Sequence, residues 1–236
     1  MRLDNTLMQV RKICCHPYLL HWPVVPGTDQ LCIDANMVRV CGKMRMLDTL
    51  LDALFARKHR VLVFSQFTGM LDILELWATD LKGWQPYRID GTTSQQDRAD
   101  QVRAFNEGKE GRDLFLLSTR ASGLGINLVG ADTVIFFDSD WNPQVDLQAQ
   151  DRAHRIGQTK PVLVFRLVAQ GTIEHDILQK AKAKRLLEAV VIQKGKFLRP
   201  ITYDGYHDPD TQDDGGLQGL EAVSYTHLRA HETGRN

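Results

Sequence analysis

Short apolar runs recur along this 236-residue chain, separated by segments of helical character. The runs cover residues 61–64, 114–117, 134–137 and 162–165, and a shorter mixed segment at 87–90 is interpreted as a further strand. Four apolar residues without polar alternation are typical of a strand that is buried on both faces. Strands that alternate with helices predict an α/β fold, a parallel sheet with helices on both faces.

The segments between these strands have the periods or caps of helices. Apolar residues recur at helical spacing from 43 to about 56 and from 67 to 81. A capping-box pattern at Ser94 predicts a helix to about residue 106. Further helices are expected around 145–154 and from about 172 to 193.

Composition divides the chain into four parts. Residues 1–42 are expected to form a helical and loop extension, which links from a preceding lobe, and residues 43–200 the α/β domain. Residues 201–222 are rich in Asp and Gly and are predicted to be disordered. Residues 223–236 are expected to be non-native read-through, so that the sequence is a partial one.

The first of these parts is expected to begin, within residues 1–22, with a helix that leads into a turn. Leu3, Leu7, Val10 and Cys14 share one face of that helix, and Pro17 stops it.

Composition also excludes several classes of protein. The chain is 43% hydrophobic and 25% charged, which rules out a fibrous or wholly disordered protein. No apolar run approaches the roughly 20 residues that span a bilayer, so no membrane segment is expected. The four cysteines lack zinc-ligand spacing, so no metal site is predicted.

The net charge of zero hides an asymmetry along the chain. Residues 204–236 contain seven acidic and two basic residues, so residues 1–203 carry a net charge of +5. This charge is compatible with a polyanionic partner, although an ordinary solvated surface is the favoured explanation from charge alone.

Polar or glycine-rich residues follow the first four predicted strands. Ligands of parallel α/β sheets bind at the carboxyl ends of the strands, so these loops are expected to line the functional edge. They are Ser65-Gln66, Asp90-Gly91, Ser118-Thr119-Arg120 and Asp138-Ser139-Asp140.

Two arginines close to the fourth loop form the strongest candidate site. On a helix Gln148, Arg152 and Arg155 would share one face, and two forked guanidinium groups suit a polyphosphate. The alternative is a solvated helix face paired to Asp146 and Asp151, which spacing alone favours.

The loop after the third strand is a second candidate. Gly123 and Gly125 would let backbone amides approach a ligand closely, with Thr119 and Asn127 as hydrogen-bonding groups. A tight turn between a strand and a helix is the equally simple alternative.

Three further features are open to two interpretations each. Asp138 and Asp140 could hold a metal, but capping a turn or pairing with arginine is the expected role. Ser65 and Gln66 offer neutral donors to a phosphate or sugar, or else a helix cap. Trp141 is expected in the core rather than near DNA.

Taken together, six blocks resemble the C-terminal RecA-like lobe of the SWI/SNF-type chromatin-remodelling ATPases of helicase superfamily 2, with the lymphoid-specific helicase subfamily as the nearest match. The resemblance covers about residues 5–198, although Cys15 and Cys41 stand where the family usually has Asn and Ser. The blocks are Arg11–Leu19, Val61–Phe67, Asp90-Gly91, Ser118–Leu128, Asp138–Pro143 and Gln148–Gln158.

The resemblance implies a role for each matching position. Arg152 and Arg155 would be arginine fingers that reach the γ-phosphate of ATP held by another lobe. The residues that would contact ATP are Gly123, Gly125, Asn127 and Gln148. The residues that would contact the DNA backbone are Ser65, Gln66 and Thr119.

The resemblance also implies cofactors and partners. These are ATP with Mg²⁺, double-stranded DNA, nucleosomes and a first RecA-like lobe, in the nucleus. Neither the phosphate-binding loop G-x-x-x-x-G-K-[ST] nor a DEAH-type acidic motif is present, and Gly42-Lys43 lacks the required preceding glycine. We therefore expect the chain alone not to hydrolyse ATP, since arginine fingers act only on a phosphate that is already positioned.

Two functions remain open from the sequence. The chain is either the second motor lobe of an ATP-dependent DNA translocase, or a stand-alone module that binds DNA or chromatin without ATPase activity. The basic stretch Lys180–Arg185 could contact phosphate, but a solvated face is the simpler explanation.

Overall fold

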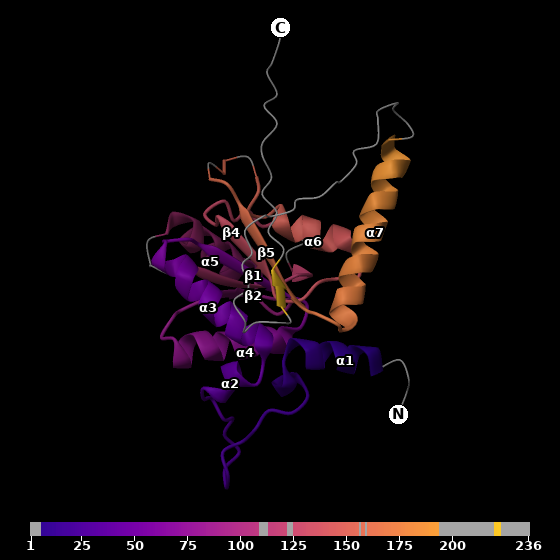
Figure 1. Ribbon diagram of the computed structural model, residues 1–236. Helices are drawn as coiled ribbons and strands as arrows, with labels where there is room; N and C mark the ends of the chain where they lie inside the picture. The colour runs from indigo at the N-terminus through magenta and orange to yellow at the C-terminus, as the bar shows by residue number, and fades with distance from the viewer. Residues whose placement is uncertain are drawn as a thin grey trace.

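A six-stranded sheet forms the centre of the molecule, in the strand order β2-β3-β1-β4-β5-β6 (Figure 1). The computed structural model describes residues 6–108, 113–121, 125–155, 157–158, 160–193 and 220–222. The first five strands are β1 Val61–Ser65, β2 Tyr87–Ile89, β3 Leu114–Ser118, β4 Thr133–Phe136 and β5 Leu163–Ala169. All pairings among these five are parallel, which confirms the predicted sheet.

Strand β1 lies at the centre and sets the register of its neighbours. Its first residue, Val61, is level with Leu114 of β3 and Thr133 of β4. Its last residue, Ser65, is level with Ser118. The carboxyl ends of these strands therefore meet at one edge of the sheet.

Alternate residues of the central strands enter two separate hydrophobic cores, as buried parallel strands require. Val61 and Val63 pack under α3 (Gly42–Ala56) and α4 (Thr68–Leu76). Leu62 and Phe64 face the opposite core, to which α5 (Gln95–Glu107) contributes Phe105 and α6 (Pro143–Gln150) contributes Ala149. The prediction of helices on both faces is thus confirmed. The helix expected over 67–81 finishes in a π-helical turn, Trp77–Leu81.

The first helix, α1 (Thr6–Cys15), presents its polar side to the protein. Arg11 is only 4% exposed, whereas Leu7 and Val10, on the apolar face that predicted this helix, are 48% and 39% exposed. The helix ends at Cys15, in agreement with the predicted stop at His16-Pro17, and His16 caps the short 3₁₀ turn Pro17–Leu19 that follows.

The rest of the N-terminal extension joins the core of the lobe. A short helix, α2 (Asn36–Arg39), lies in a segment that the sequence indicated as loop. Met37 and Cys41 are buried together with Leu47 of α3 in one hydrophobic cluster. A boundary at residue 42 stays a prediction, since side chains from both sides of it share this core.

The last helix, α7 (Ile173–Gln193), runs beside α1 and α6 (Figure 1). A strand that the sequence did not predict, β6 (Leu220–Ala222), pairs antiparallel with β5. Strand β5 would otherwise be an edge with unpaired backbone groups, and pairing satisfies them. The remainder of the predicted tail and the predicted read-through, 223–236, lie outside the described residues. No helix in the described part of the chain is long and apolar enough to cross a membrane.

Candidate functional site

The loops after β1 and β4 are joined at the carboxyl edge by Asp138. Its Oδ1 accepts from the backbone N of Gln66 at 2.8 Å, and its Oδ2 accepts from the Ser65 hydroxyl at 3.0 Å. The Ser65 side chain is completely buried, so it offers no surface to a phosphate in this conformation. Asp138 therefore fixes the loop after β1, in place of holding a metal.

Arg11 of α1 reaches the same two loops. Its Nη2 donates to Gln66 Oε1 at 3.1 Å and to the carbonyl of Ser139 at 3.0 Å. Its guanidinium also lies 5.5 Å from the centre of the Phe67 ring. Helix α1, which ends 46 positions before the first strand begins, thus contributes directly to the functional edge.

A buried ion pair lies beneath Asp138. Lys43 Nζ contacts the Glu174 carboxylate and donates to the Phe137 carbonyl at 2.7 Å. Burial by itself lowers the pKa of Lys43, but nearby negative charge, including Glu174, outweighs burial and raises it. Lys43 points into the core, which agrees with its rejection as a phosphate-loop lysine.

The thiol of Cys15 completes this cluster. Its Sγ lies 3.6 Å from Asp138 Oδ2 and 3.7 Å from Glu174 Oε1. Burial raises the pKa of Cys15 well above its ordinary value, and the charge of Asp138 raises it further, so the thiol stays protonated at neutral pH. Burial also raises the pKa of Asp138, against the opposing charge of Lys43.

A second buried pair stabilises the loop after β4. Arg166 of β5 bonds to Asp146 of α6 and to the Ser139 hydroxyl, the latter at 2.8 Å. Burial raises the pKa of Asp146, and the charge of Arg166 opposes this shift. Trp141 is half-buried and lies 5.6 Å from Lys180 Nζ, so it is not a full core residue. The carboxylates of this loop are occupied by protein donors.

Arg152 and Arg155 do not lie on a helix, and the prediction that they share a helix face with Gln148 is wrong. Helix α6 ends at Gln150, and the following residues form tighter turns. The reason is tertiary: the Arg152 carbonyl accepts from the backbone N of Leu128 at 2.9 Å, which anchors this segment to the loop after β3.

The two arginines nevertheless lie close together at the surface. Arg155 is exposed and Arg152 half-buried, and neither forms an ion pair with a carboxylate of the described residues. Burial lowers the pKa of Arg152, and the positive charge of Arg155 lowers it further. Two adjacent cationic groups without carboxylate partners favour an anion between or beside them.

The loop after β3 reaches these arginines. Arg155 Nη1 donates to the Gly125 carbonyl at 3.4 Å. Gly125 has a φ of +74°, which favours glycine, and a Cβ there would meet no atom within 4 Å, so its backbone is open to a ligand. Asn127 is exposed nearby in the chain, and its carbonyl accepts from the Asn106 side chain at 2.8 Å.

The remaining predicted residues are distributed along the same loops. Thr119 is buried, and its backbone N donates to the Ser65 carbonyl at 3.0 Å. Gln148 is exposed on α6. Gly123 lies outside the described residues. The structure thus joins Ser65, Gln66 and Thr119 in one group, and Gly125 with the arginines in another.

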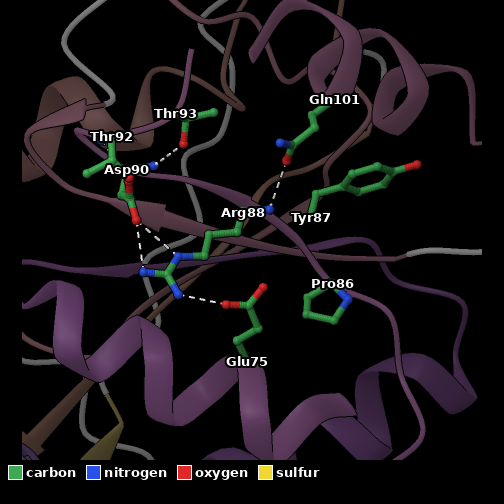
Figure 2. A pocket seen from close by; sticks show the side chains of 8 residues that line it. All are labelled: Glu75, Pro86, Tyr87, Arg88, Asp90, Thr92, Thr93 and Gln101. Atoms are coloured by element: carbon green, nitrogen blue, oxygen red, sulfur yellow. Dashed lines mark hydrogen bonds and ion pairs between the residues drawn. The ribbon is translucent and has the colours of Figure 1, made fainter. Parts of the chain in front are cut away.

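A hollow of about 540 Å³ lies beside the edge strand β2 (Figure 2). Arg88 occupies its centre and is bonded to Glu75, Asp72 and Asp90 at 2.6, 2.7 and 2.8 Å. Burial by itself lowers the pKa of Arg88, but the three carboxylates outweigh burial and raise this pKa. Of the loops expected to line the functional edge, the one that follows β2 contributes Asp90 to this hollow.

Replacing Arg88 with methionine is expected to lower the free energy of unfolding by about 2 kcal/mol, because three carboxylates then repel one another. A hydrogen bond from Thr92 lowers the pKa of Asp90, and Arg88 lowers it further. The stability that ionised Asp90 contributes is present above pH 3.8 and is lost as the pH falls through the lower pKa of Asp90 in the folded protein. The difference in unfolding free energy between the parent and Arg88→Met should therefore shrink in acid.

Urea unfolding between pH 3 and 7 measures this deficit. The control is Arg57→Met, which removes an exposed arginine that forms no ion pair with a described residue. Equal stability of the two variants at pH 7 would contradict the prediction.

The described residues contain no group of three His, Cys, Asp or Glu side chains that could hold a metal ion. The functional edge consists of donors, namely guanidinium groups, amides and hydroxyls, around carboxylates that are already bonded. Parallel strands with such loops at their carboxyl edge define a doubly wound α/β domain that binds its ligand at that edge.

Comparison with known proteins assigns the chain to a family of helicase domains and, within it, to a narrower group of relatives. Residues 42–157 match the family described as helicase conserved C-terminal domain. The crystal structure of the C-terminal part of the Fun30 ATPase domain superposes with a TM-score of 0.60 at 34% identity, over 79% of this chain and 63% of that one.

Curated relatives extend this result. Human lymphoid-specific helicase is 51% identical over 84% of this chain and 23% of its own length. Human SWI/SNF-related matrix-associated actin-dependent regulator of chromatin subfamily A member 1 is 50% identical over 84% and 19%. The ATP-dependent DNA helicase DDM1 of Arabidopsis thaliana is 49% identical over 83% and 25%.

This chain is a C-terminal helicase lobe of the SWI/SNF-type chromatin-remodelling ATPases. It spans a quarter or less of the length of these three relatives.

Proposed function

We propose that this chain is the second motor lobe of an ATP-dependent translocase on double-stranded DNA, which acts on nucleosomes in the nucleus. The observation that carries the proposal is the pair Arg152 and Arg155, two cationic side chains without carboxylate partners among the described residues, beside the open backbone at Gly125. The relatives' names, which include chromatin remodelling and ATP-dependent DNA helicases, support it.

The residues of the lobe fit one part of a bound nucleotide. Arg152 and Arg155 would hold the terminal phosphate, with Gly125, Asn127, Gln148 and Gly123 as further ATP contacts. Asp138 and Asp146 are bonded to protein donors and are poor ligands for Mg²⁺. ATP and its Mg²⁺ would therefore be held mainly by a first RecA-like lobe, and bound ATP would supply the free energy of lobe closure.

The group Ser65, Gln66 and Thr119 would serve the DNA backbone. Gln66, which is half-buried, would lie nearest to phosphate. Ser65 and Thr119 are buried in this conformation; Ser65 would act by fixing the loop through Asp138, and Thr119 through its backbone bond to Ser65. Such contacts position a protein on a duplex without reading its sequence.

Purified chain is expected to bind duplex DNA with an affinity that falls as salt rises, and to show no ATP turnover with or without DNA. Fluorescence anisotropy at several salt concentrations measures the affinity for DNA, and a phosphate-release assay measures ATP turnover. DNA-stimulated turnover by this chain alone would contradict the two-lobe division of labour, and failure to bind DNA would remove the DNA-contacting role.

A further inference from the structure

Arg11 precedes the stretch that matches the helicase family, yet its side chain is buried at the functional edge. The family match begins at residue 42, and Arg11 is 4% exposed. Within the described part of the chain it forms no ion pair with a carboxylate, and its hydrogen bonds go to Gln66 and Ser139. A buried charge is costly, so these contacts must offset a substantial desolvation penalty.

One nitrogen of Arg11 joins the loops that follow β1 and β4. Nη2 donates to the side chain of Gln66 and to the backbone of Ser139, at 3.1 and 3.0 Å. The guanidinium also packs over Phe67, the next residue of the first loop. Helix α1 is thus attached here through a polar contact, while its apolar face stays exposed.

Arg11 also determines how the Gln66 amide is oriented. A guanidinium only donates hydrogen bonds, so the oxygen of the amide must face it. The opposite end, Nε2, is buried and has no hydrogen-bond partner among the described residues. Because the backbone N of Gln66 is bonded to Asp138, the residue is fixed at both its backbone and its side chain.

We propose that Arg11 is a positioning residue: it fixes the Gln66 amide and the Ser139 carbonyl and so holds the loop after β1 in one conformation at the edge that a DNA phosphate would approach. The inference rests on the proposed function for the contact between Gln66 and DNA. It extends the functional lobe to α1, and Arg11 itself touches no phosphate.

Replacing Arg11 with methionine is expected to weaken duplex binding by the full chain about tenfold, the size of one charge-assisted hydrogen bond. The slope of log affinity against log salt should stay unchanged, because no phosphate contact is removed. A direct contact would instead reduce the slope by about one, and that result would overturn the proposal.

The matched control is Lys12→Met, which removes the same charge from the next residue. Lys12 is half-buried and forms no ion pair with a described residue. An equal loss of affinity in both variants would mean that net charge alone matters, and would overturn the proposal. Arg11→Lys keeps the charge but has a shorter side chain with a single donor group, so its affinity for DNA should fall by about threefold. This variant replaces Arg11→Met in the experiment if Arg11→Met does not fold.

A double-mutant cycle separates positioning from general stability. If Arg11 acts through Gln66, Arg11→Met should cost no further affinity in a Gln66→Ala background. An equal loss in both backgrounds would overturn the proposal, because a merely structural role does not depend on the Gln66 amide.

Hydrogen exchange tests the inference without DNA. In Arg11→Met the backbone amides of Gln66 and Asp140 should exchange at least tenfold faster, while those of Val63 and Phe64 stay protected. Unchanged exchange at Gln66 would overturn the positioning role even if DNA binds. Faster exchange in a chain that fails to bind DNA would support the positioning of the loop and reject the proposed function alone.

Discussion

Replacing Arg155 with alanine is expected to lower DNA-stimulated ATP turnover about a thousandfold or more in a two-lobed protein that contains this chain. The reason is electrostatic: charge spreads over the γ-phosphate oxygens in the transition state, and a guanidinium placed there stabilises it. Arg155 is exposed, with one long hydrogen bond to the Gly125 carbonyl, so little folding energy depends on its side chain.

The measurement needs a protein in which ATP is already held. Joining this chain to a first RecA-like lobe that contains the phosphate-binding loop G-x-x-x-x-G-K-[ST] provides such a protein. Turnover is measured with saturating duplex DNA, and thermal unfolding checks that the variant is folded.

The control for this experiment is Arg103→Ala. Arg103 is an exposed arginine of α5 that pairs with Asp100, far from the proposed phosphate contact in the sequence. Arg155→Lys should recover only part of the activity, because lysine lacks the forked donors. Turnover of Arg155→Ala within threefold of the parent would reject the arginine-finger role, and unmeasurable turnover of the parent fusion would favour a binding module.

Replacing Lys43 with methionine is expected to lower the free energy of unfolding by about 3–5 kcal/mol. Lys43 and Glu174 have side chains that are 1% and 6% exposed, and removal of the lysine leaves a carboxylate in the core. That charge would lie close to Cys15 and Asp138, where no other lysine among the described residues compensates it.

Urea unfolding of single and double variants measures how much of the lost unfolding free energy comes from the carboxylate that is left unpaired in the core. Lys43→Met combined with Glu174→Leu should recover most of it, because an apolar pair removes both buried charges together. Lys184→Met, which changes an exposed lysine of α7, should stay within about 0.5 kcal/mol of the parent. A loss below about 1 kcal/mol in Lys43→Met would contradict a dominant role of the pair.

The fold was predictable because its evidence is local. Each central strand is an uninterrupted apolar run, and the burial of both faces follows from that run whatever its partners are. The position of the candidate loops followed too, since all parallel strands end at the same edge. The prediction that Arg152 and Arg155 bind an anion came from the resemblance to the family, since their spacing alone favoured a solvated helix face.

The wrong expectation about α6 shows the limit of local evidence. Residues 151–154 have helical propensity, but a hydrogen bond from Leu128 to the Arg152 carbonyl and the amide of Gln158, bonded to the Ala131 carbonyl at 2.6 Å, hold this segment in turns. Contacts between segments that are far apart in sequence overrode propensity here.

By itself, then, the sequence determined the α/β alternation, the edge at which the candidate loops gather and the family to which the lobe belongs. Only the tertiary structure decided that Lys43 meets Glu174, 131 positions away, and that Arg11 holds Gln66, 55 positions away. Periodicity records which face of a segment is buried, but it carries no information about which distant polar group will satisfy a buried charge. That choice depends on how the layers of the fold pack.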